Sequence, residues 1–150
     1  MKRFIGLRNI VTSKSDWKYL LLYEIDGHDE NKCLQIISMY SRIQTSYIVY
    51  KTKNGFHFVG LTPLNSQEWG YYFQRLQNRY PEYFSGQTLR LSLKEGEKQE
   101  LIHYSFRYPF IGRLASMYAK RFNIPNNSIP TFGEQPKYSC VFEKYWSQKI

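Results

Sequence analysis

Residues 46–61, SYIVYKTKNGFHFVGL, predict an antiparallel β-hairpin. Two runs rich in β-branched and aromatic residues flank Asn54-Gly55, a pair preferred in type I′ turns because both central residues need a positive φ. In that turn Thr52 would pair with His57, and paired residues of neighbouring strands project from the same face of a sheet. The hairpin therefore predicts that Thr52 and His57 lie side by side.

The segment before the hairpin predicts a strand over Lys18–Ile25, which is apolar on both faces at first, as in a central strand. Towards its end, apolar and acidic residues alternate along the chain, and successive side chains of a strand point to opposite faces. Tyr23 and Ile25 should therefore project to one side of the sheet. Glu24 and Asp26 should project to the other side, so that the two carboxylates share a face.

Two helices are predicted, one on each side of the hairpin in the chain. Residues 31–43 place apolar side chains at the i, i+3, i+4, i+7 spacing of an amphipathic helix. Residues 65–80 repeat this spacing, and Asn65 and Glu68 resemble a capping pair at the start. Pro81 should end this second helix, because proline cannot continue one.

Residues 88–94, TLRLSLK, predict a further strand in which the leucines face one side and Arg90 and Lys94 the other. Strand, helix, hairpin, helix, strand is the βαββαβ order of the ferredoxin-like, or RRM-like, fold. We therefore predict an α+β fold whose helices cover one face of an antiparallel sheet and leave the other face open. In this fold the strand with Arg90 should lie beside Lys18–Ile25, with the strand of His57 on its other side.

A chain of 150 residues fits a single domain, 1–150, with this core at about 18–106 and an extension at 107–150. The other expected elements are strands at 4–11, 101–106 and 138–142, a loop at 12–16, a helix at 113–122 and an irregular C-terminal arm. No segment approaches the roughly 20 apolar residues of a membrane span, and no signal peptide is evident. Cys33 and Cys140 make neither a disulfide framework nor a zinc pattern, which favours a reducing, cytoplasmic setting.

One set of polar side chains is predicted to share the open face of the sheet. Its members are Glu24, Asp26, Thr52, His57, Arg90 and Lys94. Two carboxylates at i, i+2 can hold a divalent metal ion, and Arg and Lys side chains can neutralise phosphates. The set therefore indicates a nucleotidyl-transfer site. Taken singly, each residue also fits a solvated strand end or sheet surface, and only their convergence points to function.

Three motifs, LLLYEIDG (20–27), YIVYKTKNGFHFVGL (47–61) and TLRLSLK (88–94), resemble those of the archaeo-eukaryotic primase superfamily, the primase-polymerases. The resemblance covers roughly residues 18–106 and also follows the order of strands and helices. It implies an RRM-like catalytic core, Mg²⁺ or Mn²⁺ as cofactor, nucleoside triphosphates as substrates and template DNA.

The resemblance also implies roles for individual residues. Glu24 and Asp26 match the metal-binding, catalytic acids of the family, and His57 matches a histidine that contacts the triphosphate. Arg90 and Lys94 match basic residues near phosphate or template.

The sequence departs from the family pattern in three respects. The first acid is Glu24 where Asp is commoner, and Gly55 stands where the family often has Ser. The strand at 88–94 has no carboxylate on its open face, whereas a two-metal site needs enough negative ligands for both ions. A third carboxylate would have to come from a loop that folds back, and the acids available are Glu82, Glu95, Glu97 and Glu100.

The charge balance favours an anionic partner, since 21 Lys and Arg stand against 12 Asp and Glu, a formal charge of +9. Candidates for contact with nucleotide or nucleic acid are Thr52 and Lys53 in the hairpin, and Arg113, Lys120 and Arg121 in the predicted third helix. For these helix residues the alternative is a solvated helix face. Aromatic residues, 18% of the chain, can stack on unpaired bases, although most should fill the core.

The leading prediction is a primase-polymerase-like nucleotidyltransferase of a virus or mobile element. It would act on nucleoside triphosphates and single-stranded or template DNA, with a helicase or replication protein considered as partner. A rolling-circle replication initiator would need paired histidines on one strand, but His57 has Phe on both sides. A non-catalytic RRM-like module that binds single-stranded nucleic acid is the third alternative. Acids on the open face disfavour it, because they repel phosphate when no metal is bound.

Overall fold

The computed structural model describes residues 2–13, 16–27, 29–81, 88–93, 96–131 and 138–147, and it has an α+β fold with two antiparallel sheets. We call the first the central sheet. It consists of β3 (Leu22–Asp26), β4 (Tyr47–Lys51), β5 (Gly55–Gly60) and β7 (Glu100–Ser105) in the order β3-β5-β4-β7. The arrangement β3-β5-β4 is the one expected for the first three strands of a ferredoxin-like core.

The hairpin forms, but its register differs from the prediction by two residues. His57 pairs with Tyr50 instead of Thr52, and the Thr52 amide donates to the Gly55 carbonyl at 2.7 Å. Among the described residues neither Asn54 nor Gly55 has a positive φ, so the predicted type I′ turn is wrong. A shift of two residues preserves the alternation of side chains, and Thr52 therefore stays on the face of His57.

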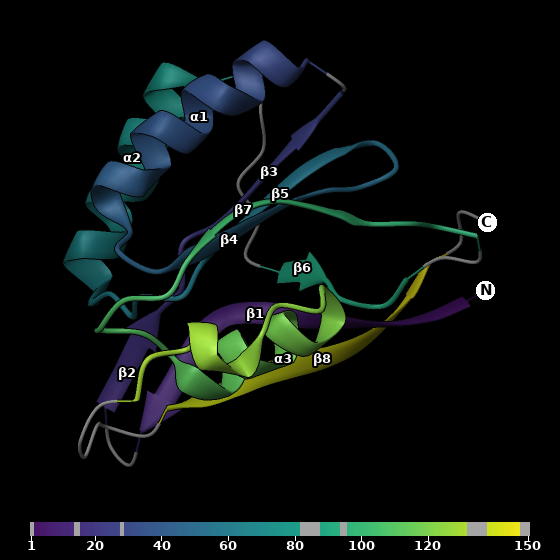
Figure 1. Ribbon diagram of the computed structural model, residues 1–150. Coiled ribbons are helices and arrows are strands. Elements are labelled where there is room, and N and C mark those ends of the chain that lie inside the picture. Colours follow the sequence, from purple (N-terminus) through teal and green to yellow (C-terminus); the bar gives the residue numbers. More distant parts are fainter. Residues whose placement is uncertain are drawn as a thin grey trace.

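The two predicted helices are confirmed and pack on one face of the central sheet (Figure 1). They are α1 (Glu30–Ile43) and α2 (Ser66–Arg79). At the start of α2, the Asn65 side chain accepts from the Glu68 amide and the Glu68 carboxylate accepts from the Asn65 amide, the predicted capping box. The core beneath the helices includes Tyr23, Ile25, Ile36, Tyr40, Val49, Phe58 and Leu76.

The second sheet, here the outer sheet, is built around the long N-terminal strand β1 (Lys2–Ser13). β2 (Asp16–Tyr19) and β6 (Thr88–Arg90) pair with β1, and so does β8 (Ser139–Ser147). β1 and β8 form a long two-stranded ribbon (Figure 1). The chain therefore buries a second core, between the outer sheet and the central sheet.

The strand predicted over Lys18–Ile25 is divided into β2 and β3, which belong to different sheets. The chain crosses between the sheets at Leu20 and Leu21, both fully buried. Leu20 packs in the core shared with the outer sheet, and Leu21 packs in the core beneath α1 and α2. The apolar run that predicted one central strand in fact supplies two cores.

The strand that carries Arg90 also lies elsewhere than predicted. β6 ends at Arg90 and pairs with β1, with Leu89 opposite Leu7, rather than with β3. Leu89 and Leu91 are buried in the core shared with the outer sheet and not beneath α1 and α2. The prediction that this strand lies beside Lys18–Ile25 is therefore wrong, because β1 offers it an apolar partner.

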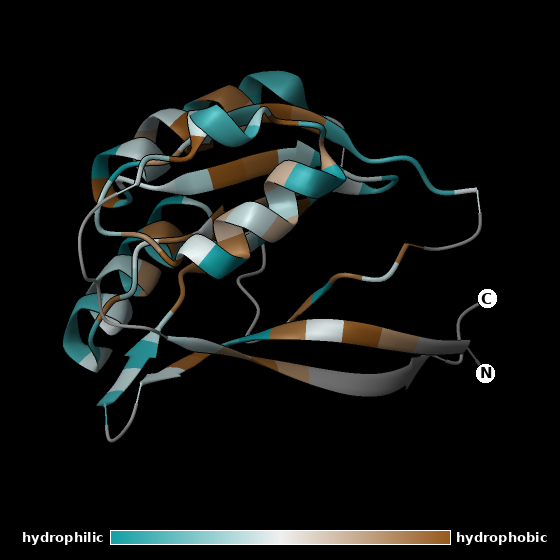
Figure 2. Cartoon of the chain, turned by 60° about the horizontal axis from the view of Figure 1, so that its bottom comes forward, coloured by the Kyte–Doolittle hydropathy of each residue, from teal (hydrophilic) through white to brown (hydrophobic). Residues whose placement is uncertain are grey.

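The face of the central sheet that was predicted to be open is largely covered. Its residues Ile48, Tyr50 and Val59 pack against Leu114 and Tyr118, together with side chains of the outer sheet. The two helix residues belong to α3 (Gly112–Arg121), which confirms the predicted third helix and precedes the short 3₁₀ helix η1 (Asn126–Ser128). In Figure 2 the strands carry hydrophobic (brown) segments, while the helices alternate between brown and teal, as expected for helices with one buried side.

None of the described helices combines the length and apolarity that a bilayer crossing requires.

Candidate functional site

A polar cavity of about 290 Å³ lies where the covered face of the central sheet ends. Its lining residues are Glu24, Asp26, Thr52, Lys53, Asn54, His57, Thr88 and Arg90. They include the two predicted acids of the strand that ends at Asp26 and the predicted hairpin residues Thr52, Lys53 and His57. Arg90 also lines the cavity. The described members of the predicted set of side chains thus converge, although at the edge of the space between two sheets instead of on one open sheet.

Alternation along β3 places its two acids in the cavity. Tyr23 and Ile25 project into the core beneath α1 and α2, which leaves Glu24 and Asp26 on the opposite face. His57 on β5 is the pairing partner of Glu24 and so projects from the same face. The prediction that Glu24, Asp26 and His57 share one face is therefore confirmed. It depended only on the alternation of side chains along each strand.

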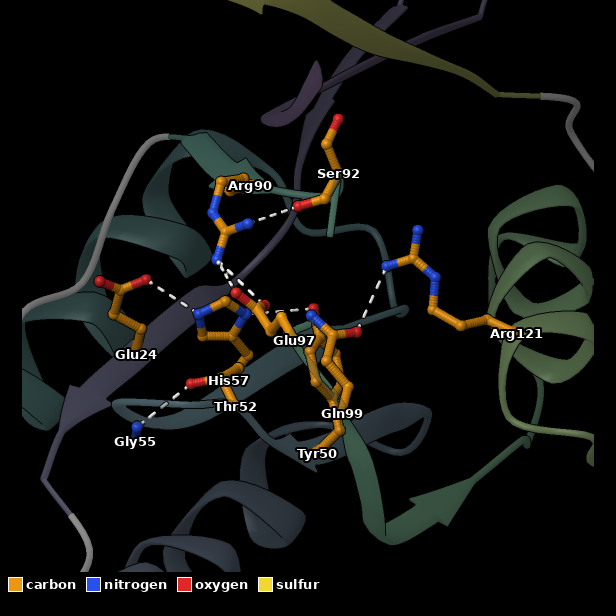
Figure 3. A network of polar contacts seen from close by, with 10 residues as sticks. All are labelled: Glu24, Tyr50, Thr52, Gly55, His57, Arg90, Ser92, Glu97, Gln99 and Arg121. Carbon is orange, nitrogen blue, oxygen red and sulfur yellow. Dashed lines mark hydrogen bonds and ion pairs between the residues drawn. The ribbon is translucent and has the colours of Figure 1, made fainter. Parts of the chain in front are cut away.

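Arg90 reaches the cavity from the outer sheet (Figure 3). Its Nη2 donates to both carboxylate oxygens of Glu97, at 3.1 and 3.0 Å, and its Nη1 donates to the Ser92 carbonyl at 2.5 Å. The guanidinium also lies 5.5 Å from the centre of the Phe4 ring, a cation–π distance. Three contacts, with Glu97, Ser92 and Phe4, therefore hold the guanidinium of Arg90 in the absence of any ligand.

Both ring nitrogens of His57 have partners. Nε2 lies 3.2 Å from the Glu24 carboxylate, and Nδ1 lies 3.2 Å from the Tyr50 hydroxyl. Burial raises the pKa of Tyr50 well above its usual value, so its phenol keeps its proton and can donate it to Nδ1. The imidazole then carries its own proton on Nε2 and donates it to Glu24. In this arrangement His57 positions Glu24, and it would contact a phosphate only by exchanging that carboxylate.

The Tyr50 hydroxyl is expected to fix the tautomer of His57. In the wild type, ¹⁵N NMR of the imidazole should show the proton on Nε2, and Tyr50→Phe should shift His57 toward a mixture of tautomers. A matched pair on the other face of the sheet provides the control, because the Tyr47 hydroxyl lies 2.8 Å from Nδ1 of His103. Tyr47→Phe should change the signals of His103 and leave those of His57 unchanged. A wild-type His57 protonated on Nδ1 would refute the assignment.

The predicted basic residues of the third helix do not join the cavity. Arg113 and Lys120 are exposed on α3. Arg121 lies over the ring of Tyr118, and its Nη1 lies 3.5 Å from Oε1 of Gln99. Lys94, the remaining predicted contact for phosphate or template, lies outside the described residues, as do Glu82 and Glu95.

Some residues of the site were missed by the sequence analysis. Thr88 lies two positions before Arg90, and residues two apart on a strand project from the same face. The alternation that identified Arg90 would therefore have identified Thr88 as well. Asn54 was assigned only to the turn. Glu97 was considered as a third carboxylate if its loop folded back, and its side chain does lie beside Arg90. Its carboxylate, however, binds Arg90 and does not line the cavity.

The two acids of the cavity suit one divalent cation. Among the described residues, no three side chains of His, Cys, Asp or Glu come close enough to enclose a metal ion by themselves. Mg²⁺ typically takes one or two protein carboxylates and completes its shell with phosphate oxygens and water. Glu24 and Asp26 fit that chemistry. A second ion finds no further carboxylate among the described lining residues.

Comparisons with protein-family models, with curated proteins and with solved structures found no match for this chain. Its function must therefore be argued from the cavity itself.

Proposed function

We propose that the cavity binds a nucleoside triphosphate together with one Mg²⁺ or Mn²⁺ ion, and that the chain is a primase-polymerase-like nucleotidyltransferase core acting on DNA. The observation that supports this most is the convergence of Glu24, Asp26, His57 and Arg90 on one cavity. They come from three strands in two sheets, and together they supply ligands for a cation and for phosphate.

Each lining residue has a role in this proposal. Glu24 and Asp26 hold the cation, which supplies charge neutralisation for the phosphates. Arg90 and Lys53 bind phosphate oxygens, and His57 orients Glu24. In the reaction, a 3′-hydroxyl loses its proton to water and forms a bond to the α-phosphorus. The bond between the α- and β-phosphates breaks, and pyrophosphate leaves. The cavity contributes mainly position and charge to this step.

One observation favours a second candidate, a nucleotide- or nucleic-acid-binding protein without turnover. Among the described residues that line the cavity there is no third carboxylate, and Glu97 is occupied by Arg90. A two-ion mechanism would therefore lack a ligand. Extension of a DNA primer distinguishes the two candidates, since only the nucleotidyltransferase incorporates the nucleotide.

Metal-dependent nucleotide binding tests the proposal. Titration of the wild type with a non-hydrolysable nucleoside triphosphate should give an affinity that rises when Mn²⁺ is added. Asp26→Asn should lower the Mn²⁺-dependent affinity by at least about tenfold, because a direct metal ligand is lost. Glu100→Gln is the matched control, since this exposed carboxylate lies at the start of β7 outside the cavity. It should change the affinity by less than about twofold. Equal Mn²⁺-dependent binding by the wild type and Asp26→Asn would contradict the proposal.

A further inference from the structure

Glu97 is a carboxylate with an unusual degree of burial. Its side chain is 1% exposed, whereas that of Arg90, its partner, is 19% exposed and borders the cavity. A buried carboxylate is stable only with compensating partners, and Arg90 Nη2 provides them to both oxygens. The guanidinium thus borders the cavity while its Nη2 holds a covered anion.

A phosphate group and a carboxylate are equivalent partners for a guanidinium. Both offer two oxygens, and both form charge-assisted hydrogen bonds with it. The anion that a nucleotide brings to Arg90 would therefore compete with Glu97 for the same Nη2 hydrogens.

The charge of the cavity depends on which anion Arg90 holds. Two carboxylates, Glu24 and Asp26, face two cations, Lys53 and Arg90. While Glu97 neutralises Arg90, the carboxylates are in excess and oppose the entry of a phosphate. Release of Glu97 restores the balance and makes the site receptive to an anionic ligand.

Gln99, two residues after Glu97, is weakly held in the described part of the chain. Gly96 adopts a positive φ of 73°, and Gln99 meets Arg121 at 3.5 Å, the long limit for a hydrogen bond. Nε2 of Gln99 is buried without a hydrogen-bond partner in the described part of the chain. An unsatisfied buried amide destabilises this arrangement of Gln99, which lowers the free-energy cost of moving it together with Glu97.

We propose that Glu97 is an internal competitor for the phosphate position of the cavity. Its carboxylate occupies the place on Arg90 that a phosphate of the ligand takes, so that binding exchanges an Arg90–Glu97 pair for an Arg90–phosphate pair. This inference rests on the proposed function and adds to it a means of regulation: any change that weakens the Arg90–Glu97 pair raises affinity for the nucleotide.

The test measures binding of Mn²⁺-tripolyphosphate, which carries the phosphates without base or sugar. Glu97→Gln keeps the shape of the side chain and removes its charge, and it should bind the probe about tenfold more tightly than the wild type, a typical coupling between competing interactions. Glu100→Gln removes the same charge from an exposed position and should change the affinity by less than about twofold. An unchanged or weaker affinity of Glu97→Gln would overturn the inference.

The outcomes separate this inference from the proposed function. Suppose that the wild type binds the probe, that Asp26→Asn binds it more weakly, and that Glu97→Gln binds it no better than the wild type. In that case only the competitor role fails. If neither protein binds it, the proposed function fails as well. A second readout uses the wild type alone: the ¹³C signal of the Glu97 carboxyl should move when the probe saturates the protein, while that of Glu100 stays in place. A stationary Glu97 signal would also contradict the exchange.

Discussion

Replacing Arg90 by glutamine is expected to lower the free energy of unfolding by about 3 kcal/mol, because it leaves the covered Glu97 carboxylate without its charged partner. The substitution also removes the cation–π contact with Phe4 and the hydrogen bond to the Ser92 carbonyl. Urea denaturation followed by tryptophan fluorescence measures the change.

The partner substitution should be much milder. In Glu97→Gln the guanidinium of Arg90 is left without its anion, but it borders the cavity and can be hydrated there, so a loss of about 1 kcal/mol is expected. The double substitution should recover part of the loss caused by Arg90→Gln, since no unpaired buried charge remains. Equal losses for the two single variants, or simple additivity in the double variant, would contradict this assignment of burial and charge.

Gly55→Ala is expected to destabilise the protein by about 3 kcal/mol or more, an effect of severe overpacking. A Cβ at Gly55 would lie 1.8 Å from the Ile25 carbonyl oxygen and 2.9 Å from Cα of Asp26. Both are backbone atoms of β3, so the strand itself would have to move. Because β3 carries the two acids of the cavity, this variant should also lose Mn²⁺-dependent nucleotide binding.

Gly70→Ala provides the matched control for this substitution. Gly70 lies inside α2, and a Cβ there would meet nothing within 4 Å. Alanine favours the helix, so this variant should be more stable than the wild type by about 0.5–1 kcal/mol. Chemical denaturation of both variants checks the pair of expectations. A Gly55→Ala variant as stable as the wild type would show that β3 and β5 are not packed as closely as the structure has them.

Rules of local structure account for what the sequence predicted correctly. The alternation of Tyr23, Glu24, Ile25 and Asp26 fixed which side chains share a face, whatever the neighbouring strand proved to be. The capping box of α2 likewise depends only on residues within one turn of helix. These features needed no knowledge of contacts between distant parts of the chain.

Long-range pairing accounts for the errors in the placement of strands. Alternation in residues 88–94 showed that Arg90 faces away from the leucines, but it carried no information on whether β1 or β3 would be the partner. The apolar run around Leu20 and Leu21 likewise held no signal for a crossing between sheets, because both residues are buried in either arrangement.

The site was easier to predict than the sheets around it. The hairpin register moved by two residues, which preserved the face of Thr52 and His57. Arg90 lines the cavity although its strand belongs to the other sheet. Glu97 and Tyr50 were not assigned their partners, since those contacts join segments whose approach no sequence pattern encodes.

The position of a bound metal ion tests the central claim most directly. Crystals grown with Mn²⁺ and a non-hydrolysable nucleoside triphosphate should show an anomalous diffraction peak in the cavity. The peak should lie at direct coordination distance, about 2.1 Å for an ion of this kind, from carboxylate oxygens of both Glu24 and Asp26, with phosphate oxygens completing the shell. A nucleotide bound elsewhere, or a manganese peak that neither carboxylate contacts, would contradict the account.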